Sequence, residues 1–154
     1  MKGFDAVYIP GADHAGFEGK GLIKETLDEL GVEYDDMGTF SEDSVDYPDY
    51  ARKVSEAVAR GEYPQGLLVC GSGTGMAISA NKVKGIRAAV AWNAETASLA
   101  RRHNNANVLA IGARTSPEGT IPEIVKAWFS ADFEGGRHAD RVDKISQIEK
   151  DDLC

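Results

Sequence analysis

The sequence is poor in the residues that many specialised protein classes require. Only two cysteines and three histidines occur among its 154 residues. Two cysteines give no disulfide framework, and the histidines form no spaced pair with a cysteine or carboxylate, so we expect no metal site. No apolar run approaches the ~20 residues that span a bilayer, and the chain does not begin like a signal peptide. We therefore predict a cytoplasmic protein without membrane contact.

Positive charge is also in short supply. Lys and Arg number 17 against 25 Asp and Glu, so the formal net charge is −8. This excess of acid disfavours nucleic acid as a partner, and an anionic ligand would have to be held by local groups. The composition is otherwise ordinary for a folded protein, with 42% hydrophobic and 27% charged residues. We expect one domain over residues 1–154.

Short runs rich in Val, Ile and Leu alternate with helical patterns along the chain. We expect strands at residues 6–9, 32–34, 67–70, 87–92 and 107–111, and helices at 22–30, 50–58, 76–83, 94–103, 117–128 and 140–150. Parallel strands need crossover connections, and these are usually helices. The alternation therefore predicts an α/β fold: a three-layer α/β/α sandwich, Rossmann-like, with a parallel five-stranded sheet and a C-terminal helical extension.

Polar residues and glycines gather where the predicted strands end. Asp13 and His14 follow the first strand, Tyr47 comes after the second, a glycine-rich segment at 71–75 follows the third, and Arg114 follows the fifth. Ligands of open parallel sheets bind beyond the carboxyl ends of the strands. These positions therefore predict a binding site at that edge.

The segment Cys-Gly-Ser-Gly-Thr-Gly at 70–75 is the strongest local motif, because it stands where a buried strand should turn into a helix. Glycines there let successive N–H groups point at an anion, and the start of a helix favours a thiolate at Cys70. A flexible turn and a merely buried cysteine remain alternatives. A dinucleotide fingerprint would need its third glycine at Met76, a Walker loop would need a lysine, and a cysteine phosphatase would need a nearby arginine.

Three other polar segments have ordinary explanations as well as functional ones. Asp13 and His14 could bind a hydroxyl or a phosphate, or could form a loop hydrogen bond. The cations in residues 101–105 complement a helix dipole, which leaves the asparagines there unexplained. Arg137 and Arg141 are four residues apart, so on a helix they would share a face and could clamp a phosphate, or could pair with neighbouring acidic side chains.

Seven short segments carry a family pattern when they are taken in order. They are Gly-Ala-Asp-His-Ala-Gly at 11–16, Asp-Tyr-Pro-Asp-Tyr-Ala at 46–51, Cys-Gly-Ser-Gly-Thr-Gly at 70–75, Ala-Asn-Lys-Val at 80–83, Gly-Ile-Arg-Ala at 85–88, His-Asn-Asn-Ala-Asn-Val-Leu at 103–109 and Glu-Gly-Gly-Arg-His at 134–138. Together they closely resemble the ribose-5-phosphate isomerase B family, which includes galactose-6-phosphate and allose-6-phosphate isomerases.

The resemblance implies an interconversion of ribose 5-phosphate and ribulose 5-phosphate through a cis-enediolate, without a metal or organic cofactor. Cys70 matches the base that moves the proton, and His103 matches the residue that opens the furanose ring. The resemblance also assigns a set of binding positions. Enediolate stabilisation falls to Gly71, Ser72, Gly73, Thr74 and Gly75, sugar hydroxyls to Asp13 and Asn104, the phosphate to His14, Arg114, Arg137 and Arg141, and the pocket wall to Tyr47.

Two positions depart from the commonest family pattern. Ser72 stands where many relatives have threonine, which preserves the hydroxyl, and Met76 stands where one branch has a catalytic glutamate. The chain therefore matches the branch that uses a thiol. The alternatives left open are an isomerase of a six-carbon sugar phosphate, a noncatalytic phosphate-binding module and a cysteine phosphatase.

The resemblance further implies a homodimer, or a homotetramer, whose active sites are shared between subunits. We expect the C-terminal segment, residues 131–154, to contact the partner subunit.

Overall fold

The computed structural model describes residues 5–8, 14–38 and 46–151, and of residues 5–8 and 14–17 it describes only the backbone. Strands and helices alternate along the chain. The elements are β1 (Asp5–Tyr8), α1 (His14–Leu30), β2 (Tyr34–Asp36), α2 (Tyr47–Ala59), β3 (Gly66–Cys70), α3 (Thr74–Asn81), β4 (Ala88–Val90), α4 (Ala94–Asn104), β5 (Val108–Gly112), α5 (Thr120–Phe129) and α6 (Arg137–Lys150).

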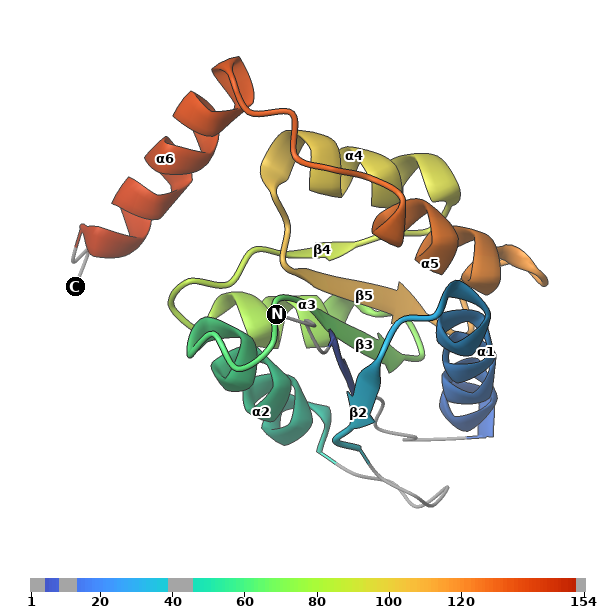
Figure 1. Cartoon of the computed structure of the whole chain (residues 1–154). Coiled ribbons are helices and arrows are strands. Elements are labelled where there is room, and N and C mark those ends of the chain that lie inside the picture. Colours follow the sequence, from blue (N-terminus) through green and yellow to red (C-terminus); the bar gives the residue numbers. More distant parts are fainter. Residues whose placement is uncertain (1–4, 9–13, 39–45, 152–154) are drawn as a thin grey trace.

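The strands form one sheet in the order β2-β1-β3-β5-β4, and every neighbouring pair is parallel. Helices α1, α4 and α5 cover one face, and α2 and α3 cover the other (Figure 1). The prediction of a parallel α/β fold is confirmed. The central strands β3 and β5 are buried at every position because helices cover both of their faces, which explains their uninterrupted apolar sequences.

Each face of the sheet has its own hydrophobic core. Ile23, Ala97 and Trp128 pack on the α1–α4–α5 side, while Val54 and Met76 pack on the opposite side. The Trp128 side chain is fully buried, and replacing such a residue by alanine costs about 3–5 kcal/mol of unfolding free energy. These two cores hold the strands, and thereby fix the edge at which the strands end.

The second strand lies two residues later than the sequence predicts. We expected it at residues 32–34, but Val32 belongs to the end of α1: its N–H donates to the carbonyl of Leu27 at 3.0 Å. Gly31, with φ of +68°, donates to the carbonyl of Asp28 at 3.1 Å. These paired bonds close a helix at a left-handed glycine and place an apolar residue directly after it.

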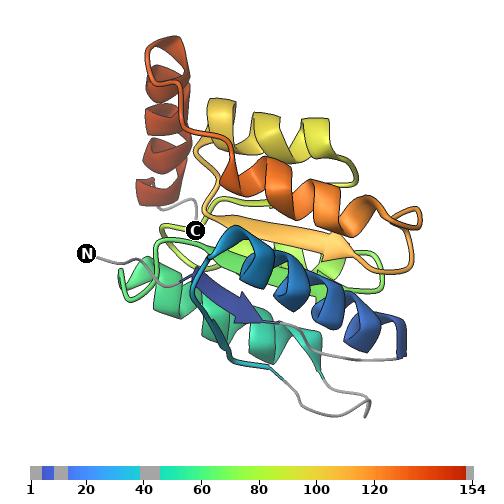
Figure 2. The same cartoon turned by 45° about the vertical axis from the view of Figure 1, so that its right-hand side comes forward.

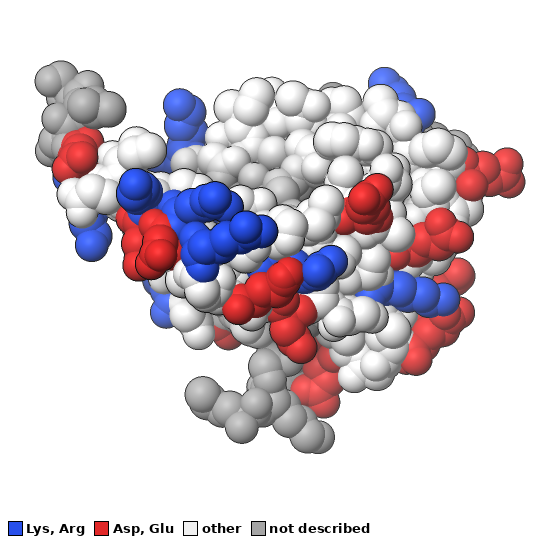
Figure 3. Space-filling model, turned by 90° about the horizontal axis from the view of Figure 1, so that it is seen from above, with Lys and Arg blue, Asp and Glu red and all other residues white. Residues whose placement is uncertain are grey.

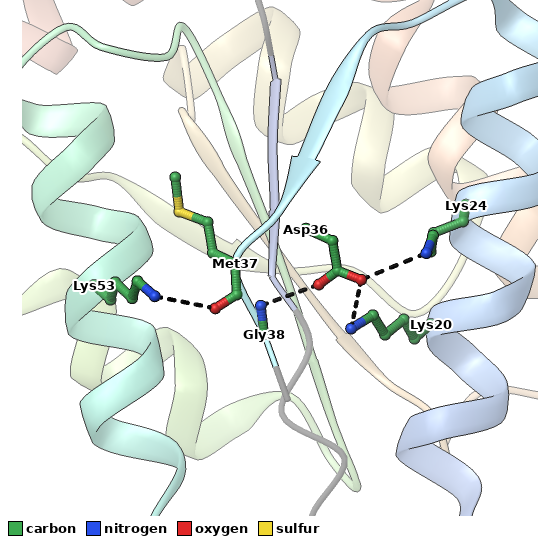
Figure 4. Close-up of polar contacts among 6 residues, drawn as sticks. All are labelled: Lys20, Lys24, Asp36, Met37, Gly38 and Lys53. Atoms are coloured by element: carbon green, nitrogen blue, oxygen red, sulfur yellow. Dashed lines mark hydrogen bonds and ion pairs between the residues drawn. The ribbon is translucent and has the colours of Figure 1, made fainter. Parts of the chain in front are cut away.

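A nearly buried ion pair holds the exit of β2 against α1 (Figure 4). The Nζ atom of Lys20 lies 2.6 Å from Oδ2 of Asp36, and Lys24 approaches the same oxygen at 3.5 Å. The other oxygen of Asp36 accepts the N–H of Gly38 at 3.0 Å. Removing one partner of a buried pair leaves an uncompensated charge and costs about 3–5 kcal/mol.

Helix α6 extends beyond the three layers (Figures 1 and 2). It begins at Arg137, three residues before the predicted start, and packs against α4. Val142 is buried, whereas Ile145 and Ile148 are 44% and 62% exposed. Across the described part of the chain, α6 and the other helices are all too short or too polar to span a bilayer.

Candidate active site

The segment that joins β3 to α3 holds Cys70 at the start of a helix. The backbone N–H of Gly73 donates to the Sγ atom of Cys70 at 3.1 Å. Gly73 has φ of +78°, and a Cβ atom on it would lie 3.0 Å from the carbonyl carbon of Ile111, so only glycine fits. The N–H group of Thr74, the first residue of α3, donates to the Ser72 hydroxyl at 3.4 Å, and the start of a helix favours an anionic ligand beside it.

The residues that directly follow β5 hold this loop from the other side. The N–H of Ala113 donates to the carbonyl of Cys70 at 2.8 Å, and the N–H of Arg114 donates to the carbonyl of Gly71 at 2.9 Å. The Arg114 side chain lies over Gly71, where a Cβ atom would meet its Cδ at 3.5 Å. The parallel pairing of β3 with β5 therefore brings a guanidinium group to the thiol loop.

A pocket of about 420 Å³ opens at this edge of the sheet. Tyr47, the first residue of α2, forms one wall, and its ring lies so close to Gly75 that a Cβ atom there would be 2.6 Å from its Cζ. Gly73 is buried beneath the loop and Thr74 is exposed at the start of α3. The pocket is lined by Tyr47, Cys70, Gly71, Ser72, Gly75, Arg114 and Thr115.

All but one of these lining residues were expected from the ends of the predicted strands. Thr115 was missed, although its place directly after Arg114 in the loop beyond β5 could have suggested it. Asp13 lies outside the described residues, and so does Cys154. His14 begins α1, and its side chain also lies outside the described part of the structure.

His103 and Asn104 do not join Cys70 within one chain. Helix α4 starts after β4 and returns to the edge at which the strands begin, where the Arg87 guanidinium donates to the carbonyl of Asn104 at 3.2 Å. Helix α4 has 11 residues and is therefore about 16 Å long, at ~1.5 Å rise per residue. Its length separates His103 and Asn104 from the edge of the sheet that holds the thiol. A site that includes both groups cannot be formed by a single copy.

Residues from the α5–α6 connection and from the first turn of α6 lie beside the His103 side chain. Its ring stacks on that of His138, with centroids 4.2 Å apart and an interplanar angle of 7°. The Nε2 atom of His103 lies 3.6 Å from Oε1 of Glu134, and Nη2 of Arg102 donates to the same oxygen at 3.0 Å. Partial burial, followed by the positive charges of His103 and Arg137, lowers the pKa of His138, and Glu134 opposes that shift.

His103, Glu134 and His138 also place three possible metal-binding atoms within 4.8 Å of one another. The arrangement does not fit a shared ion. A metal lies close to the plane of the imidazole that binds it, at about 2.0–2.1 Å from nitrogen. Two rings stacked almost parallel at 4.2 Å cannot both point at one ion in this way, and Arg102 already occupies the carboxylate.

Arg137 and Arg141 lie on the first two turns of α6, and both are exposed. The expected alternative was an ion pair with Glu134 or Asp140, but Glu134 binds Arg102 instead. Neither arginine forms an ion pair with any residue in the described ranges. Figure 3 shows Lys and Arg side chains gathered on the side of the molecule where α6 lies. These free cations could hold an anion.

Comparison with known proteins identifies the class of enzyme to which this sequence and fold belong: the sugar isomerases. The family described as Ribose/Galactose Isomerase matches residues 7–145. The chain belongs to this family.

Named relatives agree in sequence and in structure. The chain is 49% identical over 140 residues to ribose-5-phosphate isomerase B of Escherichia coli, covering 91% of this chain and 94% of that protein. The structure of Clostridium thermocellum ribose-5-phosphate isomerase B matches with a TM-score of 0.89 at 46% identity, covering 96% and 98%. That of Mycoplasma genitalium, solved with bound ribulose-5-phosphate, matches with a TM-score of 0.89 at 38% identity, covering 98% and 99%.

Proposed function

We propose that this protein interconverts ribose 5-phosphate and ribulose 5-phosphate, with Cys70 as the base. The observation that carries the proposal is the placement of Cys70: its thiol lines a pocket, accepts the N–H of Gly73 and stands at the start of α3. Family membership supplies the reaction class, and the relatives named above supply the five-carbon substrate.

The chemistry requires a proton to move between two adjacent carbons. The Cys70 thiolate takes the C2 proton of the open-chain aldose, the C–H electron pair becomes the C1–C2 double bond, and the carbonyl oxygen O1 becomes negative. The O2 hydroxyl then passes its proton to O1, and the thiol returns the carried proton to C1, which leaves a ketone at C2. Atoms and charge balance, and no redox partner is needed.

The glycine-rich loop supplies groups that stabilise the cis-enediolate. Ser72 lines the pocket, its hydroxyl accepts the N–H of Thr74 at 3.4 Å, and the N–H groups at 71–75 include those of the first turn of α3. A donor directed at a developing oxyanion is worth about 3 kcal/mol of barrier. The loop and the thiol therefore make one functional unit at the carboxyl edge of the sheet.

We infer that each site also draws on a second copy of the chain, in a homodimer. Cys70 and Arg114 lie at one edge of the sheet, whereas His103, Arg137 and Arg141 lie at or beyond the other. Two copies that bring unlike edges together would place the phosphate-binding arginines and the ring-opening histidine over the partner's thiol. Asn104 comes with them as a hydroxyl partner, and Asp13, His14 and Tyr47 are assigned to the thiol side.

The surface beside α6 suits such an association. A groove of about 600 Å³ runs between α6 and the edge strand β4, and it is lined in part by Ala88, Ile145 and Ile148. Partly exposed apolar side chains beside an unpaired strand edge are typical of surfaces that bind another chain. This supports a partner contact by residues 131–154.

The substrate is tested by an isomerase assay with a metal chelator present. We expect a higher kcat/KM for ribose 5-phosphate than for allose 6-phosphate or galactose 6-phosphate. A preference for a six-carbon substrate would contradict the proposal. The Cys70→Ala variant, purified in parallel, measures any activity from contaminating isomerases.

A further inference from the structure

We propose that Glu134 is a positioning residue for His103, holding the ring so that Nε2 faces the carboxylate and Nδ1 is left as the base that opens the sugar. This rests on the ring-opening role proposed above for His103. Glu134 acts through the histidine and does not itself touch the sugar.

Three contacts fix Glu134 beside the last turn of α4. Its backbone N–H donates to the carbonyl of Arg102 at 3.0 Å, and its Oε1 accepts Nη2 of Arg102 at 3.0 Å. The same oxygen lies 3.6 Å from Nε2 of His103. That distance is an electrostatic contact rather than a hydrogen bond, and catalytic hydrogen bonds are often long until the substrate is bound.

The stacked His138 ring restricts the orientation of His103 in a second way. A nearly parallel stack at 4.2 Å defines the plane of the His103 ring, while Glu134 defines which edge of the ring faces inward. Together they leave the Nδ1 edge facing away from the carboxylate. Among the residues that the structure describes, Nδ1 has no hydrogen-bond partner.

A carboxylate beside one imidazole nitrogen selects the tautomer in which that nitrogen carries the proton. Here it favours Nε2–H and leaves the lone pair on Nδ1. In ring opening, Nδ1 takes the proton of the O1 hydroxyl, the C1–O4 bond breaks as C1=O1 forms, and the imidazolium delivers the proton to O4. The histidine returns to its starting form.

A purely structural role is the competing explanation. Arg102 and Glu134 are both partly exposed, and a surface ion pair of this kind contributes little to stability. If the Arg102–Glu134 pair had only this structural role, it would not select a tautomer of His103. Its loss would then lower kcat/KM equally for substrates that close to a ring and for those that do not.

The test compares Glu134→Ala with wild type on two substrates. Ribose 5-phosphate closes to a furanose, whereas erythrose 4-phosphate cannot, because its O4 carries the phosphate. We expect Glu134→Ala to lower kcat/KM for ribose 5-phosphate about tenfold and that for erythrose 4-phosphate less than about twofold, with partial rescue in Glu134→Asp. The matched control is Glu62→Ala, which also removes an exposed carboxylate paired with an arginine, Arg60.

A spectroscopic measurement separates this inference from the function on which it rests. The chain has three histidines, so long-range ¹H–¹⁵N spectra can be assigned with a His103→Ala sample. We expect the Nε2–H tautomer of His103 in wild type and a larger Nδ1–H population in Glu134→Ala. An unchanged tautomer in Glu134→Ala overturns the inference. So does an equal loss of kcat/KM on both substrates in Glu134→Ala, provided that His103→Ala loses more activity on ribose 5-phosphate than on erythrose 4-phosphate. If His103→Ala itself lowers both rates equally, the ring-opening role fails, and the tautomer alone decides the role of Glu134.

Discussion

Two inactive variants should restore each other's activity if the site is built from two copies. Cys70→Ala removes the thiol at one edge of the sheet, and His103→Ala removes the imidazole at the other, about 16 Å away across the length of α4. A hybrid dimer then contains one site with both changes and one site with neither. The prediction rests on the opposite placement of the two residues and on the pairing of unlike edges proposed above.

The expected recovery follows from random pairing. An equal mixture with free exchange gives about half hybrids, and one of the two sites in each hybrid is intact, so about one quarter of wild-type activity should return. The assay is ribose 5-phosphate turnover after co-refolding, with native mass spectrometry to count hybrids. Mixing His103→Ala with Arg137→Ala is the control: both changes lie on the same edge, so every site stays defective. Hybrids without recovered activity in the first mixture would refute a shared site.

Three further outcomes are expected. Cys70→Ala should lower turnover by more than about a hundredfold while sugar-phosphate binding, measured by calorimetry, persists; Cys70→Ser should be nearly as slow, because a hydroxyl is much less acidic than a thiol. Gly75→Ala should raise KM with little change in melting temperature, because its Cβ atom would displace the 40% exposed ring of Tyr47 from the pocket. The hydrogen bond to Asp35 raises the pKa of Tyr63 to about 12 from 10.0, so denaturant titrations should show stability lost as pH rises from 10 to 12, but not in Tyr63→Phe.

The order and type of the elements could be predicted because each carries its own pattern of apolar residues. The runs at β3 and β5 are continuous since both faces are covered. The error at β2 has a local cause: Val32 looks like the start of a strand, but its N–H closes α1 by bonding to Leu27. The strand itself, Tyr34–Asp36, contains two aspartates at the edge of the sheet, which apolar patterning does not indicate.

The Cys70 side of the site could be predicted from the sequence, whereas the surroundings of His103 could not. Residues at the carboxyl ends of parallel strands must share an edge, so the grouping of Tyr47, Cys70 and Arg114 followed from the topology. The surroundings of His103 did not, because they depend on how the connection after α5 folds back over the last turn of α4. The backbone hydrogen bond from Glu134 to Arg102 anchors this connection, and no periodic sequence pattern predicts such a bond.

Because α6 lies apart from the sheet, its arginines and the thiol of Cys70 are subject to different structural constraints. The thiol belongs to a strand that is buried throughout, where any change disturbs the core, whereas the arginines stand on a helix that follows two glycines, Gly135 and Gly136, with φ of +68° and +55°. Insertions or altered angles at these glycines would move Arg137 and Arg141 while leaving Cys70 in place. On the roles proposed above for these residues, changes at the two glycines would alter the length of sugar that the site accepts and leave the proton-transfer chemistry unchanged.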